Sequence, residues 1–230
     1  MILTDLQPYT EERVWTAEDI PVLTARLTVP DPPVADDRIS RRIRRYYRLQ
    51  LRACLRRCEA FLFPRAEADF RAALAAGTLL PPCRAELDYE ITCREGALLS
   101  LCVRLRETAP QGGCRLACWG DTWDLTDGFP VPLTAFFPDR SGWKRELLAH
   151  AAEELRRQEA QGLLCPRSDA QRALRRHFNP RSYYLTPEGL VFFYPQGTLA
   201  PEGAGILTFT VPRRQSEPAA PAEKKAAPPC

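Results

Sequence analysis

The sequence contains very little lysine. Of its 32 basic residues, only Lys144, Lys224 and Lys225 are lysines, and the others are arginines. The net charge is nevertheless only +3 at pH 7, which fits neither a strongly acidic protein nor a strongly basic nucleic-acid-binding protein. Alanine and proline are plentiful, so the preference for arginine indicates a bias toward GC-rich codons. That bias lowers the weight of any signal that arginine alone carries.

Long apolar runs and targeting signals are also absent. No stretch approaches the about 18 uninterrupted apolar residues that a transmembrane helix needs. Residues 1–8 show no basic segment followed by an apolar one, so they do not predict a signal peptide. The nine cysteines are odd in number and show no regular secreted-type framework. We therefore expect a soluble, cytoplasmic protein with reduced thiols and no membrane span.

Motifs that mark enzymes are missing as well. The sequence has no nucleophile elbow, no HExxH and no Walker sequence. It has two histidines, His150 and His177, each in a predicted helix beside apolar residues. A structural role is commoner for such a histidine, although a hydrolase that uses one of them stays open. The sequence favours a protein that is not an enzyme and needs no cofactor.

Two pairs of cysteines are spaced four residues apart, and no CxxC occurs. Cys54 and Cys58 lie on the apolar face of a predicted helix, where they could share a metal ion, although buried cysteines usually act as small hydrophobic residues. Cys114 and Cys118 lie on a predicted strand, which separates them by roughly 13 Å. That is too far for one zinc ion, so we expect no metal site. Three further acidic residues are more typical of turns than of a metal or acid–base site: Asp121, Asp124 and Asp127.

Apolar periodicity and turn residues predict an α+β fold, in which a largely antiparallel sheet packs against a long N-terminal helix and one or two C-terminal helices. The expected strands are 13–15, 22–29, 83–94, 97–107, 114–125, 182–186, 190–194 and 206–211. The expected helices are a long one that Asp36 or Asp37 caps and Pro64 stops or kinks, and then 66–76, 141–161 and 168–178. In 97–107, Leu99, Leu101, Val103 and Leu105 alternate with polar residues or cysteine, which predicts a sheet with one buried face.

The same pattern predicts one domain over residues 1–212. Its N-terminal half would comprise residues 1–120 and its C-terminal half residues 121–212. Residues 213–230 consist mainly of proline, alanine, glutamate and lysine, which offer almost nothing to bury. We therefore expect that segment to be a disordered tail.

An arginine-rich face follows the long predicted helix from Arg38 to Arg57, opposite its apolar stripe. It could bind the backbone of a nucleic acid or another anionic surface. A solvated helix face in an arginine-biased sequence is the simpler interpretation, because no recognition motif accompanies it. Nucleic-acid binding is therefore the alternative function, and its candidate residues are Arg41, Arg45, Arg48 and Arg52.

Two segments resemble a known family. Residues 122–137, with Thr122-Trp123-Asp124 near Thr126-Asp127-Gly128 and Leu133 to Phe137, are similar to one of its conserved blocks. Residues 183–195, from Tyr183 to Pro195, are similar to a second block in the same order and at a similar distance. The family is the RsiV-like uncharacterised-domain family, whose members include the outer domain of a lysozyme-sensing anti-sigma factor and domains that precede peptidoglycan deacetylases. The resemblance implies an α+β fold and a non-catalytic, ligand-sensing role linked to the cell envelope.

The ligand itself is left open as an unknown protein or glycan. A positively charged domain would repel a cationic lysozyme rather than attract it. We expect the binding surface at the C-terminal hairpin and the segment that follows it. The candidate ligand-binding residues are Tyr194, Gln196, Leu199 and Glu202.

Overall fold

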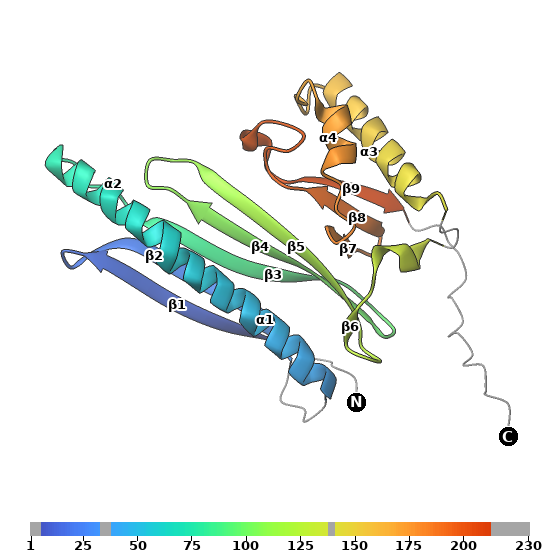
Figure 1. Cartoon of the computed structure of the whole chain (residues 1–230), viewed down its shortest axis with the longest axis horizontal. Helices are drawn as coiled ribbons and strands as arrows, with labels where there is room; N and C mark the ends of the chain where they lie inside the picture. The colour runs from blue at the N-terminus through green and yellow to red at the C-terminus, as the bar shows by residue number, and fades with distance from the viewer. Residues whose placement is uncertain (1–5, 33–37, 138–140, 213–230) are drawn as a thin grey trace.

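The computed structural model describes residues 6–32, 38–137 and 141–212. Within these residues a six-stranded sheet has the order β1-β2-β3-β4-β5-β6, and a three-stranded sheet has the order β7-β8-β9. The long helix covers one face of the large sheet, and the small sheet lies on the other side under its own two helices (Figure 1). The predicted α+β class is confirmed. The caps Asp36 and Asp37 and the tail 213–230 lie outside the described residues.

All strand pairs are antiparallel except β2 and β3, which pair in parallel. The large sheet consists of β1 (Gln7–Ala17), β2 (Ile20–Asp31), β3 (Cys83–Glu95), β4 (Leu98–Thr108), β5 (Cys114–Asp124) and β6 (Phe129–Pro130). The small sheet consists of β7 (Tyr183–Leu185), β8 (Gly189–Tyr194) and β9 (Leu207–Pro212). The helices are α1 (Arg38–Arg57), η1 (Cys58–Leu62), α2 (Phe63–Ala75), η2 (Leu133–Phe136), α3 (Trp143–Ala160), α4 (Ala170–Arg176) and η3 (Glu202–Ala204). No helix among the described residues is both long and apolar enough to span a membrane.

The first hairpin is longer than the sequence indicates. Strand β1 is expected at 13–15 but begins at Gln7, and it joins β2 through a loop of two residues, Glu18 and Asp19. Both residues have positive φ, 51° and 63°, as a type I′ turn requires. Neither is glycine or asparagine, so this turn carries none of the usual sequence signal.

The sequence predicts that Pro64 stops or kinks the long helix, but the helical chain does not stop there. The chain passes from α1 into the π-helical turn η1, in which the Phe63 N–H donates to the carbonyl of Cys58. Proline then falls within the first turn of α2, where a missing N–H costs no hydrogen bond. The wide turn therefore allows one continuous helical arm to cross the sheet.

The main core lies between this arm and the large sheet. The apolar stripe of α1, including Ile43, Tyr47 and Leu51, is buried against β2 and β4. The four alternating apolar residues of β4 lie in the same core, as predicted. Ser100 and Cys102 on the opposite face of β4 are also buried, because the small sheet packs there. The expectation of one buried face is therefore wrong for the first half of β4.

The two sheets touch at a place where side chains are small. A Cβ atom added to Gly120 of β5 would lie 1.8 Å from the carbonyl oxygen of Tyr183 in β7. Beside it, the Leu185 N–H donates to Oγ of Ser100 over 2.8 Å, and that oxygen lies 2.9 Å from Oγ1 of Thr122. Strand β7 is thus held directly against the backbone of β5.

We expect Gly120→Ala to lower the free energy of unfolding by about 3 kcal/mol or more, because the added methyl group must displace backbone and not a flexible side chain. Gly203→Ala is the matched control, since a Cβ there meets no atom within 4 Å. Urea denaturation followed by circular dichroism measures both changes. Equal stability of the two variants would contradict this contact.

Candidate functional site

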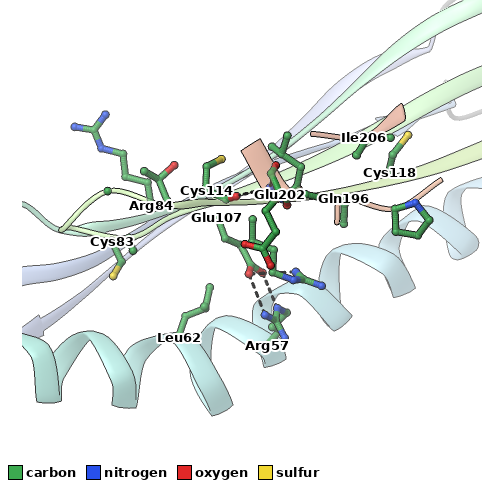
Figure 2. Close-up of a pocket in the computed structure, with 18 of the residues that line it drawn as sticks. Arg57, Leu62, Cys83, Arg84, Glu107, Cys114, Cys118, Gln196, Glu202 and Ile206 are labelled. Atoms are coloured by element: carbon green, nitrogen blue, oxygen red, sulfur yellow. Dashed lines mark hydrogen bonds and ion pairs between the residues drawn. The ribbon is translucent and has the colours of Figure 1, made fainter. Parts of the chain in front are cut away.

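A groove of about 740 Å³ runs along the outer edge of β5. On one side lies the helical arm of α1, η1 and α2, and on the other lies the segment 195–206 that joins β8 to β9. Figure 2 shows this arrangement, with Arg57 and Leu62 on the helical arm below the strands. Among the lining residues are Arg57, Leu62, Glu107, Trp119, Gln196 and Ile206.

The groove exists because most of this strand edge has no neighbouring strand. Strand β6 pairs only with Trp123 and Asp124, and the Val131 N–H donates to the carbonyl of Thr122. Because hydrogen-bond direction alternates along a strand, the even-numbered residues of β5 face outward from β4. The outward N–H and C=O groups of Cys118 and Gly120 make no hydrogen bond to any described residue.

The side chain of Gln196 covers the edge of β5 at Cys114 and Leu116. Its Oε1 accepts a hydrogen bond from the Leu116 N–H over 2.7 Å. Its Nε2 donates to the carbonyls of Cys114 over 2.8 Å and Glu202 over 2.9 Å. The amide thus imitates a strand residue and holds the segment 195–206 against β5.

A buried carboxylate at the groove, that of Glu107, joins an arginine of the helical arm to an arginine of β5. Glu107 of β4 accepts two hydrogen bonds from Arg57, at 2.5 and 2.9 Å, and one from Arg115 at 3.1 Å (Figure 2). Burial raises the pKa of Glu107, but the hydrogen bonds from Arg57 and the charges of both arginines outweigh it, so its pKa is lowered. Glu107 is therefore an anion that fixes two arginines at the groove.

Asp121 is a second buried acid, on the same face of β5, and its surroundings have the opposite effect. Its Oδ1 accepts a hydrogen bond from the Tyr46 hydroxyl over 2.8 Å, while its Oδ2 is buried without a partner among the described residues. Oε1 of Gln50 is buried and unpartnered in the same way. Burial raises the pKa of Asp121, although the hydrogen bond from Tyr46 acts in the opposite direction.

The four residues expected to bind ligand separate into two groups. Tyr194 and Leu199 lie in the core, and the Tyr194 hydroxyl donates to the carbonyl of Leu174. Placing them on a binding surface is corrected here, because helix α4 and the rest of the small-sheet core cover them. Gln196 and Glu202 do line the groove. Their role in binding stays a prediction, and the amide of Gln196 already makes structural hydrogen bonds.

The arginine-rich face of α1 lies outside the groove. Arg48 is bound to Asp31 over 2.9 Å and stacks on the ring of Tyr9, so it is a structural residue. Arg41, Arg45 and Arg52 are exposed, and none of them forms an ion pair with a described residue. Of the four candidate arginines, these three remain available to an anionic surface.

The other candidates from the sequence are dispersed. Cys54 of α1 and Cys58 of η1 are buried in the core between the helical arm and the large sheet. The described residues contain no group of three or more histidine, cysteine or acidic residues placed to hold a metal ion. His150 makes a 2.8 Å hydrogen bond with the carbonyl of Thr210, and His177 ends α4, so neither lines the groove. Asp124 and Asp127 accept hydrogen bonds within their own turn.

Sequence reasoning missed Glu107 and Trp119, and it placed Arg57 only at the end of the arginine-rich helix face. One signal could have found Glu107: it occupies the next position in the series formed by the apolar residues Leu99 to Leu105. A carboxylate on a buried face needs a cation or hydrogen-bond donors beside it. Arg57 itself had no distinguishing feature among the many arginines of α1.

Comparison with known proteins agrees with this architecture. Residues 134–214 match the family model described as "Protein of unknown function (DUF3298)". The C-terminal part of the chain is similar to the DUF3298 family. A crystal structure of a DUF3298 family member from Bacteroides fragilis has a TM-score of 0.55 at 12% identity, over 90% of each chain. A DUF3298 family protein from Pseudomonas aeruginosa has a TM-score of 0.52 at 14% identity, over 91% of this chain and 92% of that one.

At these identities the likeness to DUF3298 structures concerns the fold alone. Because it extends over about nine-tenths of the chain, the fold includes the large sheet as well as the matched segment. No curated protein sequence matches the chain. The groove must therefore be interpreted from its own residues.

Removing the Gln196 amide tests the clamp at the end of the groove. We expect Gln196→Ala to speed hydrogen exchange at the Leu116 amide and to lower the free energy of unfolding by about 1–3 kcal/mol, because buried partners lose hydrogen bonds. Gln171→Ala, at an exposed position of α4, is the control. Unchanged exchange at Leu116 would show that the clamp contributes nothing.

Asp121→Asn tests the buried acid. Folding raises the pKa of the Asp121 carboxyl, so the folded protein loses stability as the pH rises through that raised pKa. The ionised carboxylate should therefore lower the free energy of unfolding of the wild type at neutral pH. We expect the asparagine variant to be more stable at pH 7 by about 1 kcal/mol, since its Nδ2 can also donate to Gln50. The difference should shrink as the pH is lowered toward 4. Thermal unfolding across this range measures it, with Asp88→Asn at an exposed position as the control.

Proposed function

We propose that this protein is a non-enzymatic binding domain that holds an extended peptide segment of a partner protein along the edge of β5. The observation that carries the proposal is the unpaired stretch of β5 at Cys118 and Gly120, which begins in the groove at Cys118 and continues beyond Trp119. Its free backbone groups at Cys118 and Gly120 repeat at the spacing of a strand, with one N–H and one C=O at each residue. A peptide strand matches that pattern more closely than a glycan does.

The ends of the open stretch support this proposal. Gln196 occupies the edge at Leu116, and residue 131 occupies it at Thr122. An exposed strand edge ordinarily invites unspecific pairing, and proteins limit it by shortening or covering the edge. Here Gln196 and residue 131 border a short open stretch of the strand edge. That stretch has room for one extended chain, and its borders hinder pairing with a second sheet.

The side chains around the interval support a peptide ligand as well. Trp119 lines the groove and is 37% exposed, so it offers an aromatic anchor. Leu62 and Ile206 add apolar contacts, and Arg57 and Arg115 are held in place by Glu107. Aromatic and arginine side chains of this kind dominate the binding energy of many peptide grooves.

The resemblance to envelope sensor domains supports a sensing role for this domain, which would respond to the bound segment. In that role the partner would be an envelope or regulatory protein that presents an extended strand. The alternative function at Arg41, Arg45 and Arg52 has no comparable support, because those side chains face solvent on one convex helix.

A library of random linear peptides, displayed on phage and selected against the full chain, provides the probe. We expect a selected peptide to slow hydrogen exchange at the amides of Cys118 and Gly120. Replacing single peptide N–H groups with N-methyl groups should abolish binding at every second residue, because only alternate residues pair with β5. Isothermal titration measures each peptide.

The matched pair of protein variants is Trp119→Ala in the groove and Ile91→Ala outside it, with the two side chains 37% and 40% exposed. Trp119→Ala should weaken the selected peptide at least about tenfold, a loss of roughly 1.4 kcal/mol, and Ile91→Ala should leave it unchanged. A library that yields no groove binder, or exchange protection confined to α1, would contradict strand addition.

A further inference from the structure

Two cysteines lie side by side on neighbouring strands of the large sheet, on the same face. Cys102 of β4 and Cys118 of β5 have their Sγ atoms 3.2 Å apart. They are diagonal neighbours in the ladder, since Cys102 pairs with Gly120 and Cys118 pairs with Arg104. Their side chains share the face of the sheet that the small sheet covers.

The two sulfurs differ in access. Cys102 is 1% exposed and packs among Tyr184, Val191 and Phe193 of the small sheet. Cys118 is half-buried and lines the groove (Figure 2). A reagent in the groove can therefore reach Cys118 but not Cys102.

We propose that Cys102 and Cys118 form a dithiol–disulfide site, which low-molecular-weight or protein disulfides oxidise through the groove. The free thiols are close enough for this step: a disulfide bond is about 2.0 Å long, so the two sulfurs must approach by little more than 1 Å. Diagonal neighbours on antiparallel strands ordinarily lie about 7–8 Å apart, at the upper limit of what a disulfide spans, so closing the bond requires rotation of both side chains and a small approach of β4 and β5.

The oxidation is an exchange of disulfides and is balanced by its oxidant. The Cys118 thiol passes its proton to the Cys102 thiolate as its sulfur attacks one sulfur of a disulfide RSSR, which forms a Cys118–SR mixed disulfide and releases one thiolate. Cys102 gives up its proton and attacks the sulfur of Cys118, which forms the Cys102–Cys118 bond and releases the second thiolate. Overall, two protein thiols and RSSR give one protein disulfide and two RSH.

The hydrogen bond between the two thiols shifts their pKa values in opposite directions. It lowers the pKa of Cys102, with the charge of Arg104 adding to this effect, although burial opposes ionisation. It raises the pKa of Cys118, and burial adds to that rise, so the first thiolate of the pair resides on Cys102. Cys102 is therefore placed to act as the base that takes the proton of Cys118 when a reagent arrives in the groove. Burial raises the pKa of Cys54, and it raises that of Cys58 to about 11, so that pair has no such base.

Closing this bond would act on the binding groove. It would tie β4 to β5 under the small sheet, next to the open backbone groups of Cys118 and Gly120. The oxidised and reduced forms would then present a stiffer and a looser strand edge.

The full chain equilibrated with mixtures of reduced and oxidised glutathione tests the site. After acid quenching and alkylation, trypsin cleavage after Arg94, Arg104, Arg115 and Arg140 leaves one cysteine in each of the peptides 95–104 and 116–140. We expect mass spectrometry to find these two peptides joined, two hydrogens lighter than their sum, at glutathione ratios that leave Cys54 and Cys58 alkylated. A stable glutathione adduct on Cys118 without the joined peptides would overturn the proposal.

Variants separate attack from resolution. In Cys102→Ala, glutathione should remain on Cys118 at a level at least about tenfold above the wild type, because no second thiol displaces it. Cys118→Ala should leave Cys102 unmodified in the folded protein, and Cys114→Ala, at the other groove cysteine of β5, should leave the joined peptides unchanged. Loss of the joined peptides in Cys114→Ala would refute the assignment, as would absence of the adduct in Cys102→Ala. The wild-type experiment decides the matter by itself if a variant does not fold.

Discussion

The structure depends on the direct backbone contact between β5 and β7 at Gly120. Because no side chain separates the two strands there, the small sheet can lie flat across the far face of β4 and β5. That position sets where β8 ends and thus where the segment 195–206 crosses the edge of β5. Gln196 then pins this segment by three hydrogen bonds to backbone groups. One wall of the groove therefore follows from a single missing Cβ, and the other from the uninterrupted helical arm.

Two buried carboxylates on the helix-facing side of this sheet are tuned in opposite directions. Glu107 has two arginines within hydrogen-bonding distance, so its charge stabilises the fold above its normal pKa and ceases to do so as pH falls through its lowered value. Asp121 has mainly hydroxyl and amide neighbours, so its neutral form fits better and ionisation costs stability as pH rises. At the groove, Glu107 is therefore an anion in the folded protein. Near Tyr46 and Gln50, on the same face of the sheet, Asp121 has no cation beside it to stabilise its charge.

Much of the fold could be predicted from local patterns, but the contacts between elements could not. The apolar stripe of α1 identified its buried face, and the alternation in β4 identified the face that packs against the helix, but not the second face that the small sheet covers. The turn at Glu18 and Asp19 could not be predicted, because both residues adopt positive φ although neither is the glycine or asparagine that usually marks such a turn. Tyr194 was assigned to a surface because nothing in the sequence shows that α4 folds back over its hydroxyl group. Site residues drawn from several distant elements depend on such tertiary contacts, which leave no periodic trace.

The short open edge explains why a binding groove and a thiol pair occur together. Among the described residues of the β5 edge, Cys118 and Gly120 have both outward backbone groups free, so main-chain pairing alone can supply few hydrogen bonds to a bound strand. Discrimination must then come from the side chains beside that interval, chiefly Trp119 and the arginines that Glu107 holds. A thiol at one of these two edge residues is placed where a small change in strand geometry alters a large share of the available contacts. The same shortness that protects the edge from unspecific pairing thus makes its affinity sensitive to the state of Cys118.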